Sequence, residues 1–127
     1  KKITRVGGES AISVDVRIIS ATNKNLRKEI KAGRFREDLF HRLSVIEIQV
    51  PPLCERREDI PILSNYFLDK MIKANDRKVV IDKEAMELLK AFTWTGNVRE
   101  LENAIERLYV FCDDVITKGD VEKYLYW

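Results

Sequence analysis

The chain has 127 residues, with 23 lysines and arginines against 21 aspartates and glutamates, which leaves a formal net charge of +2. Hydrophobic residues make up 45% of the chain and charged residues 35%, a balance too apolar for a disordered chain and too charged for a membrane protein. The opposite charges are interspersed and nearly cancel, so composition gives no basic footprint of the kind that accompanies tight nucleic-acid binding.

The cysteines and the histidine indicate neither a disulfide framework nor a zinc site. Cys54 and Cys112 stand far apart with no CxxC pattern, and His41 is the only histidine. No apolar run approaches the roughly 20 residues that a bilayer span needs. We therefore expect a cytoplasmic protein with two reduced thiols and no contact with a membrane.

Two segments of the first half have the composition of β-strands. Residues 14–20 are rich in β-branched side chains and run into the polar Asn23. Residues 45–50 alternate apolar and polar side chains, and two prolines follow, which cannot donate to a ladder. Residues 25–31 and 37–43 between them predict two short helices. Strand, helix and strand in this order predict the last strands of a parallel α/β sheet.

The second half predicts helices only. Asp59 and Pro61 open the first helix, Asp82 caps the next, and Thr117 caps a short last one. The clearest start lies between these, where Asn97 is expected as N-cap and Glu100, three residues on, as the side chain that reaches back to the cap. A sheet of two or three strands is incomplete, so the chain is expected to be the C-terminal piece of a larger domain.

Four polar residues are candidates for binding a polyanion. Arg36 and Arg42 lie six positions apart, roughly 120° away from a common helix face, so they converge only if the segment bends at its start. Arginine suits phosphate because its planar fork binds two oxygens at once. Asn23 follows a predicted strand, where open α/β sheets bind ligands. Arg99 occupies the second position of its expected helix, where a cation is unfavourable unless an anion is bound.

Each of these residues also has a plainer interpretation. The two arginines of residues 36–42 can pair with Glu37 and Asp38 in solvent. Asn23 can be a turn residue or a helix cap. Arg99 can pair with Glu102 or Glu106 on its own helix, which would be worth only about 0.3 to 0.5 kcal/mol.

Five segments together resemble one family. They are Arg-Val-Gly-Gly at residues 5–8, residues 14–23, Gly-Arg-Phe-Arg-Glu-Asp-Leu-Phe-His-Arg-Leu at 33–43, residues 50–60, and Trp-Thr-Gly-Asn-Val-Arg-Glu-Leu-Glu-Asn at 94–103. In this order they resemble the AAA+ ATPase domain of the NtrC-like bacterial enhancer-binding proteins, the activators of sigma-54 RNA polymerase. The resemblance covers the C-terminal part of that domain.

The resemblance implies a role for each candidate. Asn23 matches sensor I, Arg36 and Arg42 match the arginine fingers that reach ATP bound by the neighbouring subunit, and Arg99 matches sensor II of the helical lid. Val98 matches a position that lines the adenine pocket. Cys54 stands where relatives commonly have arginine, and no catalytic role of the family falls on that position.

The same resemblance implies how the chain is organised and what it works with. Residues 1–58 would be the end of the α/β subdomain and residues 59–127 the all-α lid. The implied cofactor is ATP with Mg²⁺, and the implied partners are sigma-54 RNA polymerase, neighbouring subunits of a homo-oligomeric ring and, through a separate domain, DNA. The Walker A pattern G-x-x-x-x-G-K-[ST], an acidic Walker B run and the sigma-contacting loop do not occur in this sequence. We therefore expect the chain alone to be inactive as an ATPase.

One alternative belongs to another class of protein. The helices expected at residues 82–91 and 97–111, joined by a glycine-containing turn, resemble a helix-turn-helix, which would make the chain a stand-alone helical interaction or DNA-binding module. The three glutamates at the start of the second helix, where a recognition helix would meet phosphates, speak against it.

Overall fold

The computed structural model describes residues 1–125, so Tyr126 and Trp127, the last two residues of the expected lid, lie outside it. The chain divides into two compact units, one of residues 1–49 and one that begins at Val50. We call them the N-terminal unit and the helical unit. Within the described part of the chain, no helix is long and apolar enough to cross a membrane.

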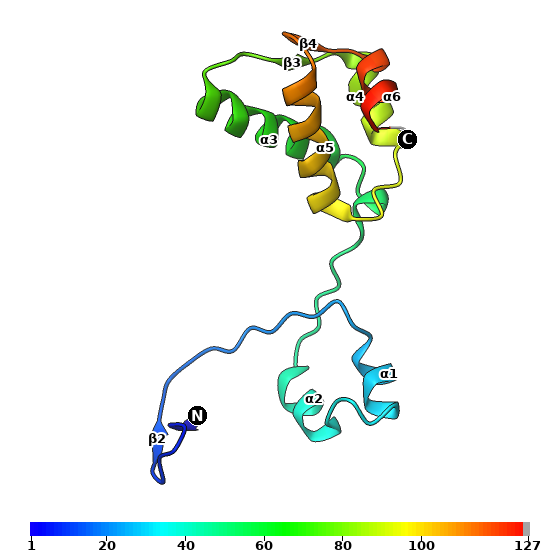
Figure 1. Cartoon of the computed structure of the whole chain (residues 1–127). Coiled ribbons are helices and arrows are strands. Elements are labelled where there is room, and N and C mark those ends of the chain that lie inside the picture. Colours follow the sequence, from blue (N-terminus) through cyan, green and yellow to red (C-terminus); the bar gives the residue numbers. More distant parts are fainter. Residues whose placement is uncertain (126–127) are drawn as a thin grey trace. The chain divides into compact units, whose positions relative to one another are not determined.

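The N-terminal unit begins with a β-hairpin that the sequence analysis does not anticipate (Figure 1). Strands β1 (Lys2–Thr4) and β2 (Ala11–Ser13) pair antiparallel, with Ile3 opposite Ile12. Gly7 adopts φ +79° in the connecting turn, a conformation that glycine takes without steric cost. The hairpin side chains are exposed, so backbone pairing rather than burial defines this element.

Both short helices of the N-terminal unit are confirmed. Helix α1 (Leu26–Lys31) is capped by Asn25, whose side-chain oxygen accepts from the Lys28 N–H at 3.1 Å. Helix α2 (Glu37–Leu43) follows, and its Phe40 is the one residue of the described N-terminal unit that is buried. The Arg27 guanidinium of α1 lies over the Phe40 ring of α2, 5.8 Å from its centre.

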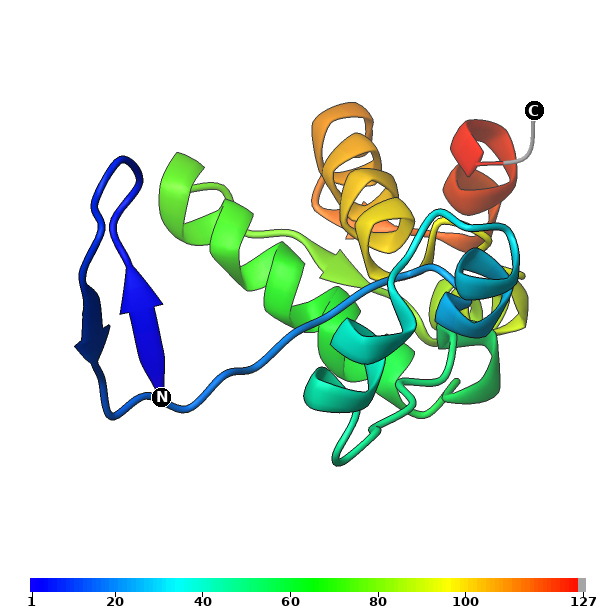
Figure 2. The same ribbon diagram turned by 90° about the horizontal axis from the view of Figure 1, so that it is seen from below.

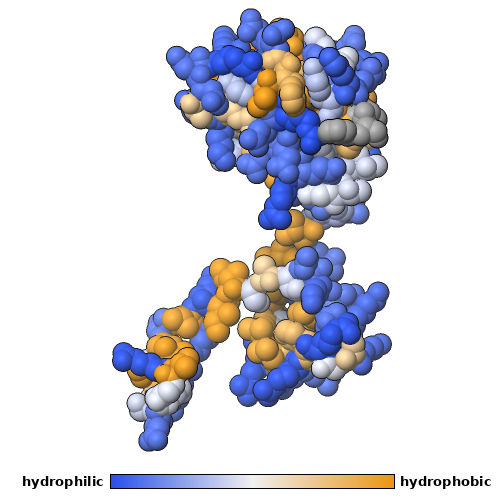
Figure 3. All heavy atoms as spheres, viewed as in Figure 1, coloured by the Kyte–Doolittle hydropathy of each residue, from blue (hydrophilic) through white to orange (hydrophobic). Residues whose placement is uncertain are grey.

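The two strands expected at residues 14–20 and 45–50 are wrong as regular structure. Neither segment pairs with any strand among residues 1–125, and Ile19, Val45, Ile46 and Ile48 are almost fully exposed. Figure 3 shows apolar side chains along extended parts of this unit. A parallel strand needs hydrogen-bonded neighbours and cover on its faces, and among residues 1–125 neither segment has them.

The helical unit confirms the helical part of the expected fold. Its elements are the 3₁₀ turn η1 (Leu53–Glu55), α3 (Asp59–Asn75), β3 (Val80–Ile81), α4 (Lys83–Ala91), α5 (Asn97–Phe111), β4 (Val115–Ile116) and α6 (Lys118–Leu125). Helix α3 lies beside α5, and α4 lies beside α6 (Figures 1 and 2). Their facing apolar side chains form one core with Leu53, Trp94 and Ile116; its helical members include Ile60, Leu89, Leu101, Ile105, Leu108 and Val121.

The helical unit is not all-α as expected, because β3 and β4 form a parallel pair. Val80 aligns with Val115 and Ile81 with Ile116. The Val80 N–H donates to the Asp114 carbonyl and the Asp82 N–H to the Ile116 carbonyl, each at 3.0 Å. The sequence gives little signal for strands of two residues, since periodicity needs a longer run.

The caps of α4 and α6 are confirmed, whereas that of α5 differs by one residue. The Asp82 carboxylate accepts from the Ala85 N–H at 2.7 Å, and Thr117 pairs reciprocally with Asp120. The N-cap of α5 is Gly96, not Asn97, and the Glu100 carboxylate accepts from the Gly96 N–H at 2.7 Å. The capping interaction of Glu100 thus exists, but it spans four residues because the helix begins one residue earlier.

Candidate functional site

Arg36 and Arg42 stand at the two ends of α2. Arg36 is the N-cap residue and has extended backbone, with φ −77° and ψ 131°, whereas Arg42 lies in the last turn. This extended backbone is usual for an N-cap residue, so Arg36 lies outside the helical repeat in which Arg42 stands. Both arginines are exposed.

Asp38 lies in the field of both arginines. The Arg36 guanidinium donates to its two carboxylate oxygens at 3.0 and 2.7 Å. This bidentate pairing is the main reason why the pKa of Asp38 is lowered, and the charge of Arg42 lowers it further. The same pair raises the pKa of Arg36. The plainer interpretation of Arg36, pairing with Asp38 in solvent, is thus realised, but an exposed pair of this kind is held weakly and a phosphate can compete for the arginine.

Asn23 lies in an exposed bend before α1. It is not the cap of that helix, because Asn25 takes this position. Within residues 1–125 its side chain makes no hydrogen bond, so the structure leaves its amide available and assigns it no structural role.

The turn that leads into α5 is locally strained. Trp94 and Asn97 both have left-handed backbone, with φ 47° and φ 55°. Such conformations cost on the order of 1–3 kcal/mol each in residues other than glycine and persist only where surrounding contacts hold them. The buried indole of Trp94 provides one of these contacts, since its Nε1–H donates to the Leu89 carbonyl at 2.7 Å.

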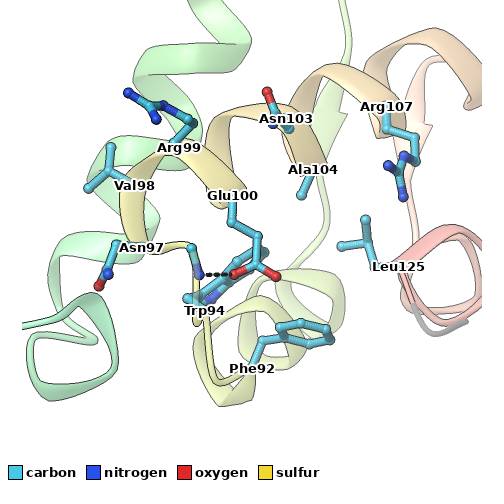
Figure 4. Close-up of a pocket in the computed structure, with 11 residues that line it drawn as sticks. Phe92, Trp94, Asn97, Val98, Arg99, Glu100, Asn103, Ala104, Arg107 and Leu125 are labelled. Carbon is cyan, nitrogen blue, oxygen red and sulfur yellow. Dashed lines mark hydrogen bonds between the residues drawn. The ribbon is translucent and has the colours of Figure 1, made fainter.

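Gly96 is needed in this turn for space rather than for backbone freedom. A Cβ atom at this position would lie 2.8 Å from the Cβ of Glu100. The close approach is what lets the Glu100 carboxylate reach the Gly96 N–H. The hydrogen bond between the Gly96 N–H and the Glu100 carboxylate therefore stabilises the first turn of α5 (Figure 4).

An open cavity of about 750 Å³ adjoins this turn. Its lining combines aromatic, aliphatic and cationic side chains, namely Phe92, Trp94, Gly96, Asn97, Val98, Arg99, Glu100, Asn103, Ala104, Arg107 and Leu125. In Figure 4, Arg99 and Asn103 project from one side of α5 and Glu100 from the other, toward Phe92 and Trp94. Arg107 points toward Leu125 and donates to the Tyr124 carbonyl at 3.3 Å.

The Arg99 side chain is exposed and makes no hydrogen bond or ion pair with any other residue of the described chain. Glu102, one of its two expected partners, instead pairs with Lys70, whose Nζ lies 3.4 Å from the Glu102 Oε1. Because α5 begins at Asn97, Arg99 is the third residue of the helix rather than the second, and it remains in the first turn, beside the positive end of the helix dipole. The surface-pair interpretation of Arg99 therefore has no support in the structure.

Val98 is half-buried and packs against the core of the helical unit while lining the cavity. The structure thus gives it a packing role whether or not a base lies against it. Sequence reasoning missed Asn103 and Arg107, which lie four and eight positions after Arg99 and share the cavity lining. The four-residue spacing along one helix was the available signal.

The side chains present suit an anionic, partly aromatic ligand such as a nucleotide. The Arg99 guanidinium at the helix N-terminus offers charge and donors to a phosphate, whereas the Phe92 ring lies on the other side of α5, beside Glu100. In residues 1–125 there is no group of three or more side chains arranged to hold a metal ion. Arg99 is a cation of this cavity lining that no other described residue engages.

Comparison with known proteins gives the same two parts. Residues 54–126 match the AAA+ ATPase lid domain, and residues 1–49 match the sigma-54 interaction domain. The regulatory protein AtoC of Escherichia coli K12 is 52% identical over 111 residues, which are 87% of this chain and 24% of AtoC. The DNA-binding transcriptional regulator NtrC of Rhizobium meliloti is 48% identical over 123 residues, 96% of this chain and 25% of NtrC.

The fold has a counterpart among solved structures. The crystal structure of NtrX from Brucella abortus in complex with ATP superposes with a TM-score of 0.77 at 44% sequence identity, over 94% of this chain and 29% of the NtrX chain. NtrX from the same organism in complex with ADP gives a TM-score of 0.78 at 42% identity, over 97% of this chain and 30% of that chain. The chain spans about a quarter of the length of the curated relatives it matches.

Proposed function

The chain belongs to the AAA+ family of sigma-54-dependent transcriptional regulators, and on this premise we propose that it is part of the ATPase motor of such an activator. In that motor, ATP hydrolysis would remodel sigma-54 RNA polymerase so that the promoter opens. The main support is that two family matches follow one another along the chain, the sigma-54 interaction domain and then the AAA+ lid. Within the motor, residues 1–58 would complete the α/β subdomain and residues 59–127 would form the lid.

Arg99 is proposed as sensor II, which contacts the phosphates of the nucleotide bound by its own subunit. Its freedom from other partners in the described chain and its place in the first turn of α5 support this role. Val98 would lie against the adenine from the same turn. A contact of Arg99 with phosphate would tie the position of the helical unit to the state of the nucleotide.

Arg36 and Arg42 are proposed as arginine fingers that act on ATP held by a neighbouring subunit. Their exposure supports this role, and Arg36 would exchange the Asp38 carboxylate for a γ-phosphate. A finger supplied in trans stabilises charge in the transition state and is worth about 10³ to 10⁵ in rate. Asn23 would act as sensor I, orienting the attacked phosphate or its water through its unengaged amide.

The remaining cofactor and partner assignments follow from the family. ATP would bind with Mg²⁺, whose ligands are not expected among the described residues. The partners would be sigma-54 RNA polymerase, neighbouring subunits of a homo-oligomeric ring, and DNA through a separate domain. Since α4 and α5 fall within the lid match, this match favours a lid over a stand-alone DNA-binding module.

The experiment is a subunit-mixing assay with the intact protein of which this chain is part. Arg36→Ala or Arg42→Ala should abolish ATP turnover and leave nucleotide binding largely intact. Arg34→Ala is the matched control, because Arg34 is an exposed arginine of the same segment that pairs with Glu29 at 2.8 Å. Mixing a finger variant with a subunit that cannot bind ATP should restore partial turnover. No recovery at any mixing ratio would contradict action in trans.

A further inference from the structure

We propose that Asn97 is a positioning residue, which fixes Arg99 relative to the segment through which the chain enters the helical unit. The inference rests on the proposed phosphate contact of Arg99. Asn97 precedes Arg99 by two positions on α5, and its side chain reaches a residue 44 positions away in the sequence.

The contact joins α5 to the start of the helical unit. The Asn97 side-chain oxygen accepts from the Leu53 N–H at 2.8 Å. Pro51 and Pro52 have no N–H, so Leu53 carries the first backbone donor after this proline pair. The Leu53 side chain is completely buried in the core, which anchors the other end of the contact. The hydrogen bond therefore connects a fixed point of the chain with the first residue of α5.

The backbone of Asn97 gives a second, independent reason. With φ 55°, Asn97 is left-handed at the very start of the helix that carries Arg99. Asparagine tolerates this conformation better than most residues, and only a side chain with an oxygen of suitable reach can also accept from Leu53. Left-handed residues that are held in place by surrounding contacts gather at functional sites.

These two requirements separate the possible replacements. Asn97→Asp keeps an acceptor oxygen and tolerates the backbone conformation. Asn97→Gly allows the same backbone conformation and lacks the acceptor oxygen, so it removes the hydrogen bond with Leu53. We therefore expect Asn97→Asp to keep the hydrogen bond from the Leu53 N–H and, with it, the position of Arg99. We expect Asn97→Gly to lose both.

The first measurement is amide hydrogen exchange of Leu53 in the 127-residue chain. Protection should be similar in the unmodified chain and in Asn97→Asp, and about 10-fold lower in Asn97→Gly, as expected for the loss of one hydrogen bond. Equal protection in all three would overturn the proposal. If Asn97→Gly does not fold, Asn97→Ser, whose hydroxyl oxygen is one carbon closer to the backbone and does not reach Leu53, takes its place under the same criteria.

The second measurement is a double-mutant cycle on the affinity of the intact protein for a non-hydrolysable ATP analogue. Arg99→Ala should weaken binding about 10- to 100-fold, and Asn97→Gly should weaken it about 10-fold. If Asn97 acts through Arg99, adding Asn97→Gly to Arg99→Ala should cost nothing more.

The cycle distinguishes the two ways of failing. If Arg99→Ala leaves affinity unchanged, the proposed function of Arg99 falls and the role of Asn97 falls with it. If Arg99→Ala weakens binding but Asn97→Gly does not, the role of Asn97 alone is wrong. Equal losses from Asn97→Gly in both backgrounds would also overturn it, since they indicate general damage to the helical unit.

Discussion

Replacing Arg99 by alanine should move stability and nucleotide binding in opposite directions. Arg99 has no partner among the described residues, so its removal breaks no internal contact. It does remove a cation from the first turn of α5, where the helix dipole makes positive charge unfavourable by about 0.3 to 1 kcal/mol. Alanine and arginine are both good helix formers, so intrinsic propensity changes little.

The expected gain in the free energy of unfolding is therefore about 0.3 to 1 kcal/mol at low ionic strength, and salt should reduce it. In a unit of this size, such a gain corresponds to a melting temperature higher by about 1 to 8 °C. In the intact protein the same substitution should cost about 1.5 to 3 kcal/mol of nucleotide binding, the value of one hydrogen bond to a charged group.

The assay is thermal unfolding of the 127-residue chain, followed by far-ultraviolet circular dichroism at two salt concentrations. Arg99→Lys keeps the charge and should show no gain. Arg107→Ala is the control on the same helix and should destabilise, because Arg107 donates to the Tyr124 carbonyl. If Arg99→Ala lowers the melting temperature as Arg107→Ala does, Arg99 is a structural residue and the reasoning is refuted.

Three further outcomes are expected. Gly96→Ala should destabilise the helical unit by about 1 to 3 kcal/mol in urea unfolding, because its Cβ would lie 2.8 Å from the Cβ of Glu100; a variant as stable as the unmodified chain would show that the turn yields easily. Burial raises the pKa of Cys112 to about 11, so alkylation at pH 8, followed by mass spectrometry, should modify the half-buried Cys54 much faster, and equal rates would contradict this. Since the folded state retains the Cys112 proton, the thiol's contribution to stability is intact below pH 9 and should be lost as pH rises toward 11. The purified chain should hydrolyse no ATP, and turnover above background in a coupled phosphate-release assay would refute this.

Local sequence signals predict most of the helices because their causes are local. Caps such as Asp82 and Thr117 satisfy the free amides of their own first turns, and apolar spacing marks the buried faces of α3, α4 and α5. The two strand predictions are wrong because strand formation depends on neighbours that are distant in the sequence. Residues 14–20 and 45–50 have suitable side chains, but a strand exists only with a hydrogen-bonded neighbour, which neither segment finds among residues 1–125.

The candidate site divides in the same way. Arg99 could be singled out from sequence because a cation in the first turn of a helix contradicts a local electrostatic rule. The bond between Asn97 and Leu53 could not, since the residues are 44 positions apart and only the packing of α5 against η1 brings them together. The roles of Asn23, Arg36 and Arg42 come from the family resemblance, and their contacts in the structure leave these roles to experiment.

The parallel pair of β3 and β4 limits how the helical unit can move. Strand β3 immediately precedes α4 and β4 follows α5, so the backbone bonds from Val80 and Asp82 join the start of α4 to the end of α5. These two ends cannot separate without breaking those bonds. Helix α6 packs on both α4 and α5, so a displacement of α5 is expected to carry α4 and α6 with it.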